Sequence, residues 1–185
     1  MKSLQAKLSL KIKIPQINRP LSPLPQDSST NECSYIVDNI YISGYKYSND
    51  YCFLKNNNFT HIINCAGGSK CFTPCKFTDF KYHSIDLRDD SSSSIIEGIL
   101  YFISLIQNIQ QENQKNKILI HCAGGISRAP ALVCSYLMWK KNIDSKTAIN
   151  YIKQKRSCID INIGFVFQLN SLTKDFFTKI QNSRQ

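Results

Sequence analysis

The chain has 185 residues, of which 42% are hydrophobic and 19% charged, a mixture typical of one globular domain with a short extension and too small for two full domains. No apolar run approaches the roughly 20 residues that a membrane-spanning helix needs. The eight cysteines are too irregularly spaced for a disulfide scaffold, and the N-terminus lacks the pattern of a secretory signal. We therefore expect a soluble protein in a reducing compartment, the cytoplasm or the nucleus.

The charge is strongly positive. Lysine and arginine number 23 against 13 acidic residues, which gives a net charge of +10 and favours anionic partners. The basic residues form no continuous block and do not alternate with aromatic residues as in proteins that read nucleic acids. The pattern therefore favours an enzyme that handles phosphate over a nucleic-acid-binding protein.

Residues 1–33 differ in composition from the rest of the chain. Four of the six prolines fall within eleven residues, and the polar stretch that follows them also favours a flexible, extended tail. Lys11 and Lys13 precede Ile14, a short basic and apolar pattern that would also fit an arm that docks on a protein kinase. An uncommitted tail is the simpler interpretation.

The first predicted element after the tail is a β-hairpin over residues 35–42, with Asp38-Asn39 at its turn. A short helix is expected from Ser48 to Lys55. Three compact runs are predicted to be strands: 61–65, 82–87 and 117–121.

Apolar residues at three- and four-residue steps predict helices between and after these strands. The predicted helices cover 95–109, the residues after Arg128, about 145–156 with a cap at Asp144 or Ser145, and 164–180. Strands that alternate with helices indicate an α/β fold, with a central, mostly parallel sheet flanked by helices on both faces.

The segment with the clearest chemical meaning is 118–130, where a buried strand ends at His121, a loop of small residues follows and a helix begins near Arg128. Glycines allow successive backbone N–H groups to turn inward, and the start of the helix adds partial positive charge, so the segment can bind an anion. The candidate phosphate-binding residues are Ala123, Gly124, Gly125, Ile126, Ser127 and Arg128.

Cys122 lies at the start of this loop and is the candidate nucleophile. The loop amides, the helix dipole and the neighbouring His121 all favour a reactive thiolate, and we expect His121 to orient the loop as well. Arg128 can fold back over the loop and offer its planar guanidinium to two phosphoryl oxygens.

The pattern His-Cys-x-x-Gly-x-x-Arg, formed by His121, Cys122, Gly125 and Arg128, resembles the signature of the cysteine-dependent protein tyrosine phosphatases. The residues around it are similar to the dual-specificity branch of that superfamily. The similarity covers residues 34–180, which implies a catalytic domain over this range and a short C-terminal tail at 181–185.

The resemblance implies a protein phosphatase that acts on phosphotyrosine and on phosphoserine or phosphothreonine, without a metal or cofactor. In the family's mechanism Cys122 forms a phosphocysteine intermediate, and an aspartic acid protonates the leaving group and then activates water. Asp89 occupies the position of that acid, 33 residues before Cys122. Asp90 is the alternative, whereas strand alternation should turn Asp86 away from the loop.

One position departs from the family's pattern. The residue after the arginine is usually serine or threonine, whose hydroxyl helps the thiolate to leave phosphocysteine, and here it is Ala129. We therefore expect an active enzyme in which hydrolysis of the intermediate is slow.

The other cysteines allow further interpretations. Cys65 ends the strand expected beside the loop and could form a disulfide with Cys122, or remain a buried thiol. Cys71 and Cys75 resemble half a metal site, but no second pair of ligands stands at a suitable spacing.

The alternatives to a protein phosphatase are a phosphoprotein-binding or kinase-scaffold module of weak activity, and a phosphoinositide or RNA 5'-phosphatase of the same superfamily. The loop interior carries no lysine, which disfavours the lipid substrate. We expect phosphoproteins as partners, among them a protein kinase, no membrane association, and a monomer.

Overall fold

The structure is a computed structural model that describes residues 32–68 and 76–182. The predicted tail up to residue 31, the pair Cys71 and Cys75, and residues 183–185 lie outside the described residues. Within them, no helix is long and apolar enough to cross a membrane.

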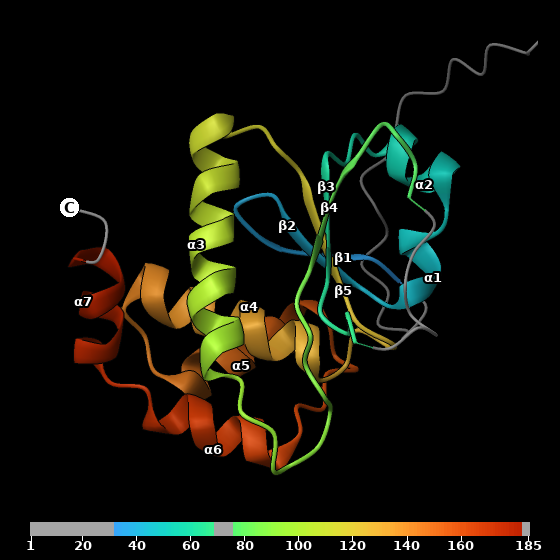
Figure 1. The fold of residues 1–185 in the computed structure, drawn as a ribbon. Coiled ribbons are helices and arrows are strands. Elements are labelled where there is room, and N and C mark those ends of the chain that lie inside the picture. Colours follow the sequence, from blue (N-terminus) through green and yellow to red (C-terminus); the bar gives the residue numbers. More distant parts are fainter. Residues whose placement is uncertain (1–31, 69–75, 183–185) are drawn as a thin grey trace, which may run out of the picture.

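A five-stranded sheet forms the centre of the domain, in the order β1-β2-β5-β3-β4 (Figure 1). β1 pairs antiparallel with β2, and every other neighbouring pair is parallel. The strands are β1 (Ser34–Val37), β2 (Ile40–Ser43), β3 (His61–Asn64), β4 (Lys81–Ser84) and β5 (Ile118–His121). The mostly parallel sheet predicted from the sequence is confirmed.

The predicted hairpin between β1 and β2 is also confirmed. Asp38 and Asn39 both have positive φ, 47° and 61°, the combination that the tightest two-residue hairpin turns require and that these residue types tolerate. Residues just before the hairpin pack with the domain, because Cys33 is buried in its core.

Helices cover both faces of the sheet, as expected (Figure 1). On one face lie α1 (Tyr45–Ser48) and α2 (Tyr51–Asn56), and on the other lie α3 (Ile96–Glu112), α4 (Arg128–Lys141), α5 (Ser145–Lys155), α6 (Ile163–Ser171) and α7 (Lys174–Asn182). In β5, Ile118 and Ile120 face the larger helical layer and Leu119 faces the smaller one. The strand is buried throughout, which explains why its first three residues are all apolar.

Two of the predicted helices were wrong in extent. The helix expected over 48–55 is two short helices, because the Asp50 side chain accepts a hydrogen bond from the Phe53 N–H and starts α2 anew. The single helix expected over 164–180 breaks between α6 and α7, where Leu172 takes an extended backbone and packs against the core. No glycine or proline marks this break, so the apolar pattern hides it.

One predicted strand was also misplaced. β4 begins one residue before the expected range 82–87 and ends at Ser84, since beyond that point only an isolated bridge joins Asp86 to Ala66. The segment after β4 is therefore irregular, and it leads from the sheet to the candidate acid Asp89.

Candidate active site

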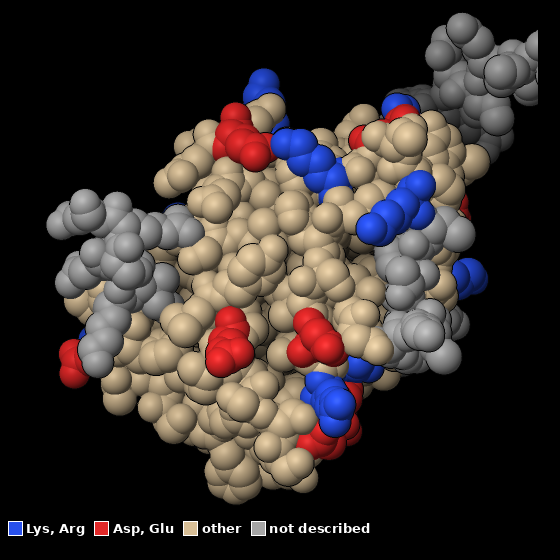
Figure 2. Space-filling view, viewed as in Figure 1, with Lys and Arg blue, Asp and Glu red and all other residues tan. Residues whose placement is uncertain are grey.

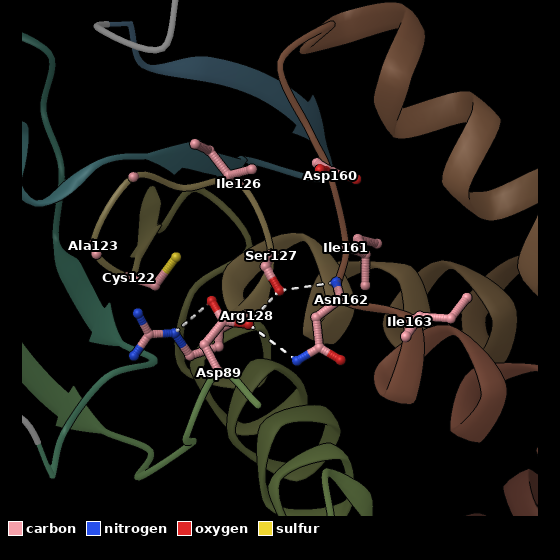
Figure 3. A pocket seen from close by; sticks show the side chains of 11 residues that line it. Asp89, Cys122, Ala123, Ile126, Ser127, Arg128, Asp160, Ile161, Asn162 and Ile163 are labelled. Atoms are coloured by element: carbon pink, nitrogen blue, oxygen red, sulfur yellow. Dashed lines mark hydrogen bonds and ion pairs between the residues drawn. The ribbon is translucent and has the colours of Figure 1, made fainter. Parts of the chain in front are cut away.

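The loop between β5 and α4, residues 122–127, forms the floor of the candidate site (Figure 3). Gly125 has a φ of +66°, and a Cβ at this position would lie 2.4 Å from the Ser43 carbonyl oxygen. Only glycine fits such a turn so close to a neighbouring strand. The loop is therefore fixed by both conformation and space.

Each carbonyl of this loop accepts a hydrogen bond from outside it. The donors to Ala123, Ile126 and Ser127 are the backbone N–H groups of Tyr45 (2.8 Å), Asp160 (3.0 Å) and Ala131 (2.9 Å). Because the carbonyls accept hydrogen bonds from groups outside the loop, the backbone N–H groups of the loop are available to bind an anion.

Arg156 donates hydrogen bonds to the two carbonyls in the middle of the loop. Its Nε donates to the Gly125 oxygen at 2.8 Å and its Nη2 to the Gly124 oxygen at 3.0 Å. Nη1 donates to the Glu32 carbonyl and the Ser34 hydroxyl, which ties the loop to the first strand. Only 2% of Arg156 is exposed.

Cys122 is 2% exposed and lies at the base of a pocket of about 590 Å³. Figure 3 shows its sulfur turned into the space that the loop surrounds. The volume lies within the range of small-molecule pockets and leaves room for an aromatic side chain above the loop. The lining residues are Asp89, Cys122, Ala123, Gly124, Ile126, Ser127, Arg128, Asp160, Ile161, Asn162 and Ile163.

Arg128 and Asp89 meet inside this pocket. Arg128 Nε lies 3.3 Å from Asp89 Oδ2, and Arg128 Nη1 donates to the Leu87 carbonyl at 3.4 Å. The guanidinium therefore lies between the loop and the segment that carries Asp89, where its planar face of donors can reach a bound phosphoryl group.

A network of side chains holds Asp89 at the rim of the pocket. Its Oδ1 accepts hydrogen bonds from the Ser127 hydroxyl at 2.6 Å and from Asn162 Nδ2 at 3.2 Å. The Ser127 hydroxyl in turn accepts from the Asn162 N–H at 3.1 Å. Asp89 is thus joined to the start of α4 and to the start of α6 (Figure 3).

The two competing acids lie elsewhere. Asp90 accepts hydrogen bonds from Ser92 and Ser93 in its own turn, and Asp86 accepts one from the Gly68 N–H. Of the three aspartates that the sequence analysis weighed, the structure brings Asp89 into the pocket with Cys122.

His121 contacts the backbone of the nucleophile. The ring is fully buried, with Nδ1 3.3 Å from the Cys122 carbonyl oxygen and the Tyr45 ring 6.2 Å away. Burial lowers the pKa of His121 to about 4, so the ring is neutral near pH 7. It is thereby suited to hold the first peptide of the loop, without a charge of its own.

Cys65 and Ala129 are both buried beside the site. The Cys65 N–H donates to the His121 carbonyl at 2.7 Å, and burial, with a further contribution from Cys122, raises the pKa of the Cys65 thiol well above its ordinary value. Cys65 is therefore a protonated thiol at neutral pH, and its pairing with Cys122 stays a prediction. No group of three or more potential metal ligands occurs among the described residues.

Three parts of the site were not predicted from the sequence: Arg156, Asn162 and Asp160. Arg156 follows a helix rich in lysine, where a basic residue normally faces solvent. Asn162 is typical of a helix cap, and it does cap α6. The only signal in the sequence was that the similarity to the family extends over residues 34–180, and such a similarity does not show which groups a side chain contacts.

Most of this chain is similar in sequence to known proteins. Residues 40–175 match the family model described as "Dual specificity phosphatase, catalytic domain". The Protein-tyrosine-phosphatase MKP1 of Arabidopsis thaliana is 37% identical over 139 residues, which are 75% of this chain and 17% of the relative. The MAP kinase phosphatase with leucine-rich repeats protein 2 of Dictyostelium discoideum is 30% identical over 142 residues, 77% of this chain and 19% of the relative. The chain thus spans about a fifth of the length of these relatives.

Among solved structures, a human tyrosine phosphatase-like serine/threonine/tyrosine-interacting protein superposes with a TM-score of 0.67 and 28% identity. The match covers 75% of this chain and 93% of that one. The fold therefore belongs to a known architecture.

The hydrogen bonds of Arg156 predict that the loop loses its shape when the guanidinium is replaced. In Arg156→Lys, one ammonium cannot reach all four acceptors. We therefore expect the affinity of the loop for tungstate, an oxyanion that resembles phosphate in shape and charge, to fall about tenfold or more, as measured by calorimetry. Lys155→Met, which removes an exposed charge one residue away, should bind tungstate as the wild type does. Equal affinity in a folded Arg156→Lys protein would contradict the assignment.

The lowered pKa of His121 predicts a pH dependence of stability. Between the ordinary value near 6.5 and about 4, the unfolded chain binds a proton that the folded chain does not, so stability is complete above pH 6.5 and declines as the pH falls toward 4. His121→Gln should show a smaller change in the free energy of unfolding between pH 7 and pH 5 than the wild type. Identical changes in urea titrations would refute the role of burial.

Proposed function

The chain belongs to the dual specificity phosphatase family, and from that premise we propose that it hydrolyses phosphotyrosine and phosphoserine or phosphothreonine in proteins through Cys122. The observation that carries the proposal is that Cys122, Arg128 and Asp89 line a single pocket. A nucleophile, a phosphate clamp and a proton donor are the three groups that this reaction needs.

In the first step the loop N–H groups and Arg128 bind the three phosphoryl oxygens. The Cys122 thiolate attacks phosphorus, and the bond to the ester oxygen breaks as charge moves onto that oxygen. Asp89, at the rim, gives its proton to the departing oxygen. The product alcohol or phenol leaves, and the phosphoryl group stays on sulfur.

In the second step water attacks the phosphocysteine. Asp89, now a carboxylate, accepts a proton from that water, and the sulfur leaves as a thiolate. Inorganic phosphate departs, and Asp89 is again protonated for the next cycle. Ser127 and Asn162 hold the Asp89 carboxyl group through both steps.

The charges of the pocket support a singly phosphorylated substrate. Among the described residues that line the pocket, Arg128 is the one cation, and two are acids, Asp89 and Asp160. Figure 2 shows Lys and Arg scattered over the viewed face, so the net charge of +10 is not gathered at one place there. A phosphoinositide or a 5'-triphosphate would bring further negative charge to this pocket, where one cation is accompanied by two acids, and this disfavours both substrates.

The substrates that we propose are therefore phosphoproteins, protein kinases among them, as the name of the Dictyostelium relative suggests. We also propose that the chain acts as a monomer in the cytoplasm or the nucleus. The second candidate function is a phosphoprotein-binding module of low turnover, which Ala129 and the name of the human structural neighbour favour.

The proposal predicts a graded loss of activity. Cys122→Ser should abolish hydrolysis of a phosphotyrosyl peptide, and Asp89→Asn should lower kcat about 100-fold or more, the usual size of an acid catalyst's contribution. The loss in Asp89→Asn should be larger for a phosphothreonyl peptide than for p-nitrophenyl phosphate, whose leaving group needs no proton.

The matched control is Asp90→Asn, because Asp90 lies next in the chain and bonds only within its own turn. It should retain wild-type kcat. Equal activity of the wild type and Cys122→Ser would refute the cysteine mechanism, and tight binding of phosphopeptides without turnover would favour the binding module.

Ala129 predicts that the second step limits turnover. A hydroxyl at this buried position can donate to the Cys122 sulfur and stabilise the departing thiolate, so Ala129→Ser should raise kcat. Ala131→Ser, at another fully buried alanine of α4, is the control for adding a hydroxyl. Unchanged turnover in Ala129→Ser, with no pre-steady-state burst in either protein, would eliminate this explanation.

A further inference from the structure

Two large apolar side chains stand out of the surface beside the pocket. Ile163 is 60% and Phe167 68% exposed, the highest values among the exposed large hydrophobic residues described; the next is Tyr101 at 51%. Their spacing of four residues on α6 puts them on one face of the helix, one turn apart. Single exposed apolar residues are ordinary, but a pair at the mouth of a candidate active site is a surface that a substrate can use.

The pair is continuous with the site. Ile163 lines the pocket that contains Cys122, and Figure 3 shows it at the outer end of the rim, beyond Asn162 as seen from Cys122. Phe167 follows one turn further from the start of α6. A peptide chain that leaves the pocket on this side would therefore cross Ile163 first and Phe167 next.

The position of α6 relative to the pocket is fixed. Asn162 caps the helix by accepting from the Phe165 N–H at 3.1 Å, while its own Nδ2 donates to Asp89. On the buried side, Phe165 and Leu169 are fully enclosed in the core. The two exposed side chains therefore stand on a helix that is anchored both to the catalytic network and to the core.

The chemistry of α6 restricts what it can bind. Its sequence, IGFVFQLNS, contains no charged residue in a chain of which 19% is charged. Within its own sequence the helix offers a partner neither an ion pair nor the lysines and arginines with which surface helices bind anionic lipid. What it offers is apolar area, which favours an apolar side chain of a protein substrate.

We propose that Ile163 and Phe167, together the α6 ridge, bind a bulky apolar side chain located within three residues of the phosphorylated residue in the substrate. The inference rests on the proposed phosphatase function and adds a sequence preference to it. The four residues from Ile163 to Phe167 advance about 6 Å along α6, which equals about two residues of extended peptide. The ridge is therefore long enough to contact two substrate residues, the one next to the phosphorylated residue and the one three positions away from it.

The test uses pairs of synthetic phosphotyrosyl peptides that carry either leucine or the similarly sized polar asparagine, placed in turn at each of the three positions on both sides of the phosphotyrosine. In the wild type we expect kcat/KM to favour leucine about fivefold at one or two positions on one side only, mainly through KM. Fivefold corresponds to about 1 kcal/mol, less than full burial of a leucine yields.

Phe167→Ala should reduce this ratio toward one, and Phe167→Gln should do the same. Because Phe167 is mostly exposed, both variants should fold, which circular dichroism can verify. The matched control is Tyr101→Ala, which removes an exposed aromatic ring from α3 and should keep the fivefold ratio.

A ratio near one at every position in the wild type, with the peptides still hydrolysed, would overturn the inference and leave the proposed function intact. Absence of Cys122-dependent hydrolysis of every peptide would instead refute the proposed function. The inference would also fail if Phe167→Ala left the ratio unchanged but converted a dimer to a monomer in sedimentation. The same holds if it weakened binding to phosphatidylserine vesicles, because the ridge would then serve self-association or a membrane.

Discussion

A backbone loop that binds an anion must point its N–H groups at the ligand, and its carbonyls must then find partners on the other side. In this protein that constraint is met for every carbonyl from Cys122 to Ser127. Backbone N–H groups serve three of them, the His121 ring contacts one, and the Arg156 guanidinium serves the two in the middle. Since unpaired buried carbonyls are costly, these partners hold the loop in its binding shape before any ligand arrives.

The hydrogen-bond donors to the loop carbonyls come from distant parts of the chain. The loop's partners come from the start of α1, the end of α5, the segment before α6 and the hydrogen-bonding ladder of α4 itself, and through Arg156 the loop also contacts the chain just before β1. The candidate acid is held in the same way, because Asn162 bonds both Asp89 and Ser127. The site is thus a product of the whole domain, and its positive potential comes from oriented amides and from Arg128 at close range. The diffuse surplus of lysines contributes mainly to long-range attraction of anions.

The sequence predicted what local rules decide. Three features each depend on a few neighbouring residues whose conformational preferences are strong: the Asp38-Asn39 turn, the helix cap expected at Asp144 or Ser145 and found at Asp144, and the strand-loop-helix around Cys122. The breaks before α2 and between α6 and α7 were not predicted, because apolar residues continue at helical spacing across them. It is the packing of the chain against the rest of the domain that ends the helices there. Arg156 could not be assigned from its neighbours, since nothing within helix α5 tells which distant carbonyls its guanidinium meets. Asp89 was favoured over Asp90 only by its match to the family's motif and spacing, because neighbouring acids in an irregular segment differ chiefly in which way they point. In the structure it is Asp89 that lines the pocket.

We propose that this loop carries a phosphoryl group on Cys122 during the reaction. This can be tested by mixing the protein with excess phosphotyrosyl peptide, quenching with acid within milliseconds and locating bound phosphate by mass spectrometry of the digested chain. We expect one phosphoryl group on the peptide that contains Cys122, formed before steady state is reached. Phosphate on another residue, or none on the protein while peptide is being hydrolysed, would contradict it.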